Sequence, residues 1–244
     1  MRLPHVLFFT AMAVVEGGVC FDRTRLSWNP SIVHLPNFLN ASACESIRSM
    51  AQSKLHYNED VQWTAPGKRS SSGVWFPREE ERQSTTWNPL LLKIHDFVGL
   101  SPDHGSNFKV SRYKPGEKYT VHADAKPGMF RSLTFLGYLN TPLKGGHTIF
   151  PRLLSNGMLS EYSNRSTNWL NRNFKSLCKN QNILSIVPRA GDAVVFAPLT
   201  PWMEINPLAD HASCPVYKGE KYVVQRWFQP FANPNWHKNG NHPW

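Results

Sequence analysis

Short apolar segments, separated by glycine and proline, recur along the chain between residue 108 and residue 228. The separators include Pro115-Gly116, Gly145-Gly146 and Gly219, and these residue types end strands and form turns. The segments have the length and the β-branched and aromatic content of strands. So many short strands indicate a mainly β fold, a sandwich or a barrel. We predict strands at 108–114, 119–124, 132–140, 147–150, 183–187, 193–197, 212–216 and 221–228.

The region before these strands predicts helical support for the β core. We expect a strand within residues 27–39, then a helix that Asn40 or Ser42 caps and that runs to about Leu55. Asn88-Pro89 begins a second helix, with apolar residues at helical spacing. Residues 57–87 are expected to form a long loop, with a lid or substrate loop as the alternative. Both helices are expected to pack outside the strands, which makes the fold class α+β.

Length and charge restrict the class of protein. A chain of 244 residues with 41% hydrophobic and 12% aromatic residues is expected to fold as one domain. The formal net charge is +10, but the basic residues are dispersed and form no block. A dispersed charge indicates a basic surface and not a nucleic-acid partner. Residues 153–182 are polar and interrupt the strands, so we expect an insertion at one end of a barrel.

The first 20 residues predict a signal peptide. A basic start precedes the apolar run from Val6 to Val15, which Glu16 ends. The run is short for a bilayer span, so an uncleaved signal anchor is the alternative and no stable span is expected after cleavage. The sequons at Asn40 and Asn164 fit entry into the secretory pathway. We expect a protein of the endoplasmic reticulum lumen or a secreted one, although the chain ends without a lumenal retention tetrapeptide.

The cysteines agree with an oxidising compartment. Once Cys20 is removed with the signal peptide or beside it, Cys44, Cys178 and Cys214 remain. An odd count favours one disulfide and one free thiol. Cys178 and Cys214 are the preferred pair because both flank predicted core strands, with two free thiols as the alternative.

One tripeptide, His122-Ala123-Asp124, carries a pattern for metal binding. Side chains at positions i and i+2 of a strand point to the same face, so the imidazole and the carboxylate would meet at one point. A second histidine would complete a 2-His-1-carboxylate triad, which holds Fe(II) and leaves positions open. His211 lies at the start of a later strand, and Lys221 opens the next one. A lysine facing the interior of a barrel needs an anionic partner, and a dicarboxylate co-substrate would supply one.

With these residues in place, the chain resembles the prolyl 4-hydroxylase family of Fe(II)/2-oxoglutarate dioxygenases. The resemblance implies a double-stranded β-helix, or jelly-roll, as the core at 106–230, a support region at 21–105 and a tail at 231–244. The motifs that carry it are Tyr113 to Tyr119, His122-Ala123-Asp124, Arg131 to Asn140, Gly145-Gly146-His147-Thr148, Pro188 to Ala193, and His211 with Lys221 ten positions later.

The resemblance also assigns roles to single residues. His122, Asp124 and His211 match the iron ligands. Lys221, Tyr113 and Thr148 match residues that bind 2-oxoglutarate. Arg131 and Trp227 match positions near the substrate peptide or the iron. The chain departs from the family at His147, where glutamate is usual, and at Tyr222, where tryptophan is common, and these departures bear on the fit of the substrate.

The implied reaction is the hydroxylation of peptidyl proline, similar to that of procollagen-proline 4-dioxygenase. It would use Fe(II), 2-oxoglutarate and O2, with L-ascorbate to rescue oxidised iron. The same chemistry on lysine or on a small molecule is one alternative, and a non-catalytic subunit on the same fold is another. A proline-containing peptide or protein is the expected partner, with the loops at 57–87 and 153–182 selecting it. A partner subunit is compatible with the sequence.

Overall fold

The computed structural model describes residues 22–57 and 67–232. The predicted signal peptide, Cys20 and the tail beyond residue 232 lie outside the described residues. Fourteen strands and a few short helices make up the regular structure of the described residues, so the predicted mainly β class with helices is confirmed. Among the described residues, no helix has both the length and the apolar character needed to cross a bilayer.

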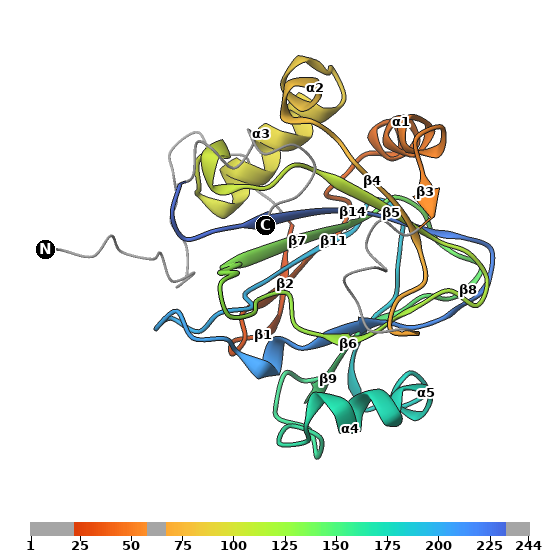
Figure 1. Cartoon of the computed structure of the whole chain (residues 1–244), viewed down its shortest axis with the longest axis vertical. Coiled ribbons are helices and arrows are strands. Elements are labelled where there is room, and N and C mark those ends of the chain that lie inside the picture. Colours follow the sequence, from red (N-terminus) through yellow and green to blue (C-terminus); the bar gives the residue numbers. More distant parts are fainter. Residues whose placement is uncertain (1–21, 58–66, 233–244) are drawn as a thin grey trace, which may run out of the picture.

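Two antiparallel sheets form the body of the molecule (Figure 1). The large sheet has eight strands in the order β1-β2-β11-β7-β14-β5-β4-β3. Its strands are β1 (Thr24–Ser27), β2 (Ile32–Leu35), β3 (His56–Tyr57), β4 (Ser72–Trp75), β5 (Lys109–Tyr113), β7 (Leu133–Tyr138), β11 (Ala193–Phe196) and β14 (Lys221–Phe228). The small sheet has four strands in the order β10-β9-β12-β6. They are β6 (Tyr119–His122), β9 (Thr148–Leu154), β10 (Ile183–Ile186) and β12 (His211–Ser213).

Side chains from the inner faces of the two sheets pack between them. Strand β7 shows why, since its residues alternate between the two faces of the large sheet. Leu136 and Tyr138 face inward and pack with Phe150 of β9, whereas Phe135 faces the other way. A two-stranded sheet of β8 (Lys144–Gly145) and β13 (Val216–Lys218) lies at one end of the two large layers.

Helices cover the outer face of the large sheet (Figure 1). They are α1 (Ala41–Gln52), α2 (Arg78–Gln83) and α3 (Trp87–Val98). Ile47 of α1 and Ile94 of α3 are fully buried against Phe135 and Val224. Asn40 caps α1 as predicted, because its Oδ1 accepts a hydrogen bond of 2.7 Å from the N–H of Ala43.

The predicted start of the second helix was wrong. Helix α3 begins at Trp87 and not at Asn88. The hydroxyl of Ser84 accepts from the N–H groups of Thr86 and Trp87, at 3.2 Å each. A serine upstream of the expected position therefore satisfies the free donors of the first turn, and Pro89 lies within that turn.

The expected loop at 57–87 was also only partly right. Its described part contains β4, which pairs with β5, and helix α2. Helix α2 has no apolar face and docks through charge: Glu81 and Arg226 are both fully buried and form an ion pair of 2.9 Å. Hydrophobic periodicity cannot reveal a helix that is held in this way.

The insertion at 153–182 covers the outer face of the small sheet, so its predicted place at the end of a barrel was wrong. It contains α4 (Thr167–Arg172) and α5 (Phe174–Leu177). Leu170, Phe174 and Leu177 are buried against Val121 and Ile149 of the sheet. The insertion thus supplies the hydrophobic cover that one face of a sheet in water requires. Figure 1 shows α4 and α5 beyond β9 and β6.

Candidate metal and co-substrate site

Three side chains from two strands and a turn converge at one point. Strand β12 pairs with β6 so that His211 lies opposite His122. Strand β6 ends at His122, so Asp124 follows the strand and does not lie on it as predicted. One ligand atom from each of His122, Asp124 and His211 lies within 4.8 Å of the others. The described residues contain no other group of three or more histidine, cysteine and acidic side chains placed to hold a metal.

Backbone carbonyls fix the orientation of both imidazoles. Nδ1 of His122 lies 2.8 Å from the carbonyl oxygen of Thr120, and Nδ1 of His211 lies 3.1 Å from that of Ala209. A carbonyl can only accept, so each Nδ1 carries a proton and Nε2 is the nitrogen left to offer a lone pair to a metal. Both Nε2 atoms are 3.9 Å from a carboxylate oxygen of Asp124. This tautomer is the one that binds a metal through Nε2.

The carboxylate of Asp124 is held by several donors. Its Oδ2 accepts hydrogen bonds from the hydroxyl of Thr134 at 2.8 Å and from the indole nitrogen of Trp227 at 3.0 Å. Its Oδ1 lies 3.5 Å from the guanidinium of Arg131, which stacks over the ring of Trp227. Arg131 and Trp227, predicted near the substrate or the iron, therefore contact a candidate metal ligand.

Charges in the site favour the protonation states that a metal needs. Burial alone would raise the pKa of Asp124, but the neighbouring His211, Arg131 and His122 lower it to about 2. Burial and the nearby His211 hold the pKa of His122 well below its usual range. At neutral pH, Asp124 is ionised and His122 is neutral. These are the forms that donate electron pairs to a cation.

Lys221 is buried without a carboxylate. Its ammonium donates to the carbonyl of Gly146 at 2.7 Å and to the hydroxyl of Ser213 at 2.9 Å. Its Nζ also lies 5.5 Å from the ring of Tyr113 and 5.6 Å from that of Tyr138. No acidic side chain in the described part of the chain forms an ion pair with it. Burial lowers the pKa of Lys221 to about 7.

The other two residues predicted to bind the co-substrate lie around Lys221. Tyr113 of β5 is its direct neighbour across the sheet. Thr148 of β9 is buried, and its hydroxyl accepts a hydrogen bond of 2.9 Å from the hydroxyl of Tyr138. Ser213, which bonds Lys221, lies two residues after His211 on β12. Strand β12 therefore carries both a hydrogen-bond partner of Lys221 and one of the three converging side chains.

The family model described as the 2OG-Fe(II) oxygenase superfamily matches residues 108–229. The chain belongs to the 2OG-Fe(II) oxygenase superfamily. Within it, the chain is similar to "Probable prolyl 4-hydroxylase 3" of Arabidopsis thaliana, with 32% identity over 215 residues that cover 83% of this chain and 70% of the relative. The chain is thus a prolyl 4-hydroxylase-like 2OG-Fe(II) oxygenase, as the sequence predicts.

Solved structures with low sequence identity share the fold of this oxygenase. A viral collagen prolyl hydroxylase from Paramecium Bursaria Chlorella virus-1, solved as a 2OG complex, superposes with a TM-score of 0.56. It is 22% identical, and the match covers 80% of this chain and 94% of the viral one. A prolyl hydroxylase from Trichoplax adhaerens, in complex with a hypoxia inducible factor peptide fragment, gives 0.55 at 15% identity and covers 86% and 87% of the two chains.

The residues of this oxygenase fit both groups that its superfamily implies. Two imidazoles whose Nε2 atoms face one carboxylate make up the donor set of a facial Fe(II) site with open positions. A buried ammonium with only neutral partners suits the carboxylate of 2-oxoglutarate, since an unpaired buried charge is costly. The residue assignments themselves remain predictions that metal and ligand binding must test.

Several residues that contact the site were given no role by the sequence. The ring of Tyr119 stacks on His122 with centroids 3.5 Å apart, and Phe196 packs against His211 at 4.7 Å. Thr134, Tyr138 and Ser213 contact predicted site residues through hydrogen bonds. For Thr134 and Tyr138 a signal existed, because both face inward at alternate positions of one predicted strand.

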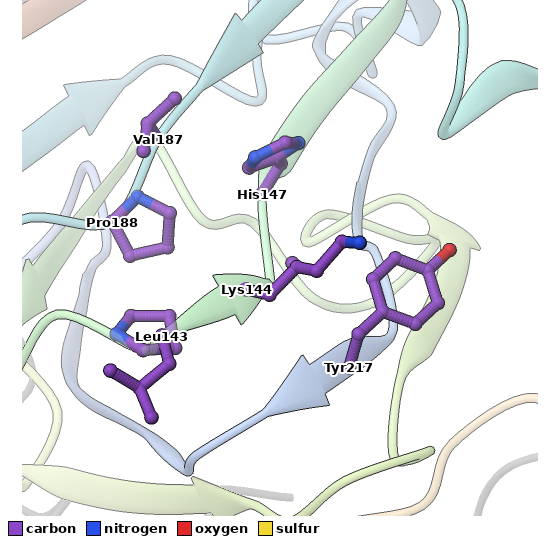
Figure 2. Close-up of a pocket in the computed structure, with 8 residues that line it drawn as sticks. Leu143, Lys144, His147, Val187, Pro188 and Tyr217 are labelled. Carbon is purple, nitrogen blue, oxygen red and sulfur yellow. The ribbon is translucent and has the colours of Figure 1, made fainter.

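A separate cavity of about 300 Å³ lies beside the two-stranded sheet of β8 and β13 (Figure 2). His147, Lys144 and Tyr217 are among its lining residues. None of the predicted site residues lines it. Gly146, which stands between the lining residues Gly145 and His147, lies against Lys221, since a Cβ there would come within 3.1 Å of the lysine side chain. His147, one of the departures from the family pattern, thus faces this outer cavity.

The predicted cysteine pair and sequons have plain positions in the structure. Cys178 and Cys214 form a disulfide, and Cys44 is buried as a free thiol. Asn40 and Asn164 are both exposed. Glycosylation at either asparagine remains a prediction.

Proposed function

We propose that this oxygenase hydroxylates peptidyl proline at C4, with Fe(II) as cofactor and 2-oxoglutarate and O2 as co-substrates. We further propose that its two facing sheets form a double-stranded β-helix whose interior holds the reaction. The buried ammonium of Lys221, which lacks a carboxylate partner, carries the co-substrate part of this proposal. The likeness to prolyl 4-hydroxylases supports the choice of proline.

Each site residue has a defined task in the proposed reaction. His122, Asp124 and His211 would hold Fe(II), which when bound supplies the activation of O2 and the oxidation of a C–H bond. Lys221 would neutralise the distal carboxylate of 2-oxoglutarate, and the rings of Tyr113 and Tyr138 would exclude water around it.

Arg131 and Trp227 would act beside the iron ligands. Trp227 and Thr134 hold Oδ2 of Asp124 by hydrogen bonds, which limits rotation of the carboxylate. Arg131 lies against the face of Trp227 and would line the approach of the peptide. Ascorbate would keep the iron reduced between turnovers.

Mass spectrometry of a proline-rich peptide tests the reaction. The purified protein, with Fe(II), 2-oxoglutarate and ascorbate, should add one oxygen to proline, and amino-acid analysis should identify 4-hydroxyproline. His122→Ala should abolish the product. Turnover that survives this substitution would refute the ligand assignment. Oxygen gained at lysine, or only on a small molecule, would refute the prolyl substrate and leave the dioxygenase chemistry standing.

The proposed location is the secretory pathway, in the endoplasmic reticulum lumen or beyond it. Two exposed sequons support this proposal. Translation with microsomes should give a product that loses mass with glycosidase. Ser42→Ala tests the first sequon and spares the Asn40 cap, whereas Asn164→Gln tests the second and spares Ser166, which caps α4. A product that remains accessible to protease and carries no glycan would contradict the proposal.

A further inference from the structure

Arg152 of β9 ties the insertion to the small sheet. One guanidinium nitrogen, Nη1, donates to the carbonyl of Ser163 at 2.7 Å and to that of Arg165 at 2.5 Å. These carbonyls flank Asn164, so a single buried side chain fixes the loop that leads into α4. The cost of burying a guanidinium in this way requires a compensating partner.

That partner is Asp210, the residue before the candidate iron ligand His211. The other terminal nitrogen of Arg152 lies 3.1 Å from Oδ2 of Asp210. The hydroxyl of Thr167, the first residue of α4, donates to the same oxygen at 2.9 Å. The side chains of Arg152 and Asp210 are both 5% exposed. Side chains from both the sheet and the insertion therefore hold the carboxylate of Asp210 in place.

The position of Asp210 is linked to the orientation of the His211 imidazole through the neighbouring residue Ala209. Asp210 ends the short helix η3 (Pro207–Ala209), and the carbonyl of Ala209 accepts from Nδ1 of His211 at 3.1 Å. This bond sets which nitrogen faces Asp124. A shift of Asp210 would move the carbonyl that orients the imidazole, because the two residues are neighbours in the chain.

The insertion holds the other side of His211 as well. Cys178, directly after α5, is bonded to Cys214, three residues after His211. Leu170 of α4 and Phe174 of α5 pack with Ala212, the residue next to His211. Both flanks of this ligand are therefore anchored to the same insertion. His122 also meets the insertion through its neighbour Val121, whose carbonyl accepts a hydrogen bond of 3.1 Å from the side chain of Asn171, but among the described residues no disulfide or buried ion pair is added there.

We propose that the insertion at 153–182 positions His211 for metal binding, with Arg152, Asp210 and Thr167 as its positioning residues. This inference rests on the proposed function, since it assumes that His211 binds the metal. Residues that orient metal ligands from behind change metal affinity by about 10- to 100-fold when they are removed. The insertion would then act on the metal centre and not only on the stability of the fold.

Cobalt(II) affinity measures the effect without turnover. Asp210→Ala in the full chain should weaken Co(II) binding by about tenfold or more. Thr167→Val keeps the branched shape and removes one donor to Asp210, so it should weaken binding in the same direction by a smaller factor. The visible spectrum of bound cobalt should also change in Asp210→Ala, because the spectrum reports ligand geometry.

Asp192→Ala is the matched control. Asp192 is equally buried, pairs with His34 at 2.9 Å and accepts from the N–H of Asn37, but it lies on another part of the fold. The Asp192→Ala variant should have a lower free energy of unfolding than the wild type and the same affinity for cobalt. Equal losses of affinity in the two alanine variants would overturn the inference, as would unchanged affinity and spectrum in Asp210→Ala and Thr167→Val. If Asp210→Ala does not fold, Thr167→Val decides alone. Failure of the wild type to bind cobalt would instead refute the proposed metal site.

Discussion

The indole nitrogen of Trp227 donates a hydrogen bond of 3.0 Å to Oδ2 of Asp124, across 103 positions of sequence. The hydroxyl of Thr134 donates to the same oxygen from the neighbouring strand, at 2.8 Å. With Oδ2 occupied by two donors, Oδ1 faces His122. Residues of the large sheet therefore set the rotation of the Asp124 carboxylate, which follows β6 at the edge of the small sheet.

Thr134→Val removes one of these donors and keeps the shape of the side chain. We expect the affinity for Fe(II) or Co(II) to fall by about 10- to 100-fold, as for other groups that orient a metal ligand. Equilibrium titration of the metal measures the change. Thr141→Val is the control, because it removes only an exposed hydroxyl that accepts from Ala190. Equal affinities for the wild type and Thr134→Val would show that Asp124 does not need this support.

Lys221→Met should separate co-substrate binding from stability. The substitution removes a buried ammonium that has only neutral partners, so the unliganded variant should melt no lower than the wild type. With Co(II) present, 2-oxoglutarate at about 100 times its Kd should stabilise the wild type by about 2.7 kcal/mol and the variant not at all. Thermal melts with and without the keto acid measure both effects. A variant that still gains stability from 2-oxoglutarate would contradict the role of Lys221.

The protonation of Lys221 should make co-substrate binding depend on pH. Burial lowers the pKa of this lysine from its ordinary 10.5 to about 7, and a bound carboxylate should raise it again. Above pH 7, binding of 2-oxoglutarate should therefore take up a proton, and affinity should fall as pH rises. Calorimetry in two buffers of different ionisation enthalpy measures the uptake. No proton uptake in the wild type would contradict the account.

The same lysine links the stability of the unliganded protein to pH. Between pH 7 and 10.5, the unfolded chain holds a proton on Lys221 that the folded chain has lost. Since the unfolded state binds more protons, the free energy of unfolding should gain a contribution that rises with pH across this window. Urea unfolding at several pH values measures the slope, and Lys221→Met should flatten it. Identical slopes in the two proteins would show that Lys221 is not buried as an unpaired base.

Glu81→Gln should destabilise the fold strongly. It leaves the fully buried guanidinium of Arg226 without its counter-charge, so the free energy of unfolding should fall by about 3–5 kcal/mol. Glu80→Gln on the same helix breaks an exposed pair with Lys54 and should cost at most about 1 kcal/mol. Urea unfolding compares the two variants, and similar losses would contradict the dependence of α2 on its buried charge.

The sequence predicted most strands of the core, because glycine and proline mark their ends and apolar residues fill them. The strand predicted at 212–216 was wrong, since the chain there leaves β12 at Ser213 and enters β13, in another sheet, at Val216. The sequence also predicted that His122, Asp124 and His211 would meet. The prediction assumed that His122 and Asp124 share one face of a strand. The two side chains do converge, but β6 ends at His122 and Asp124 lies beyond it. Long-range pairing of β6 with β12 supplies the rest.

Local sequence patterns could not predict helix α2, which a buried ion pair holds, or the helices of the insertion, which depend on packing against the sheet. Helix α2 shows no apolar periodicity, and its buried residues are Arg78 and Glu81. The insertion reads as a polar segment in the sequence. Its few apolar residues, Leu170, Phe174 and Leu177, lie on short helices that pack against the sheet. The partners of Asp124 and Asp210 are far away in sequence, so no local pattern marks them.

Anaerobic titration with Fe(II) and then with 2-oxoglutarate tests whether His122, Asp124 and His211 bind one iron and whether Lys221 holds 2-oxoglutarate beside it. The wild type should bind one equivalent of Fe(II) and then 2-oxoglutarate, His211→Ala should lose the iron, and Lys221→Met should keep the iron and lose the keto acid. Iron bound as tightly by His211→Ala as by the wild type would contradict the account.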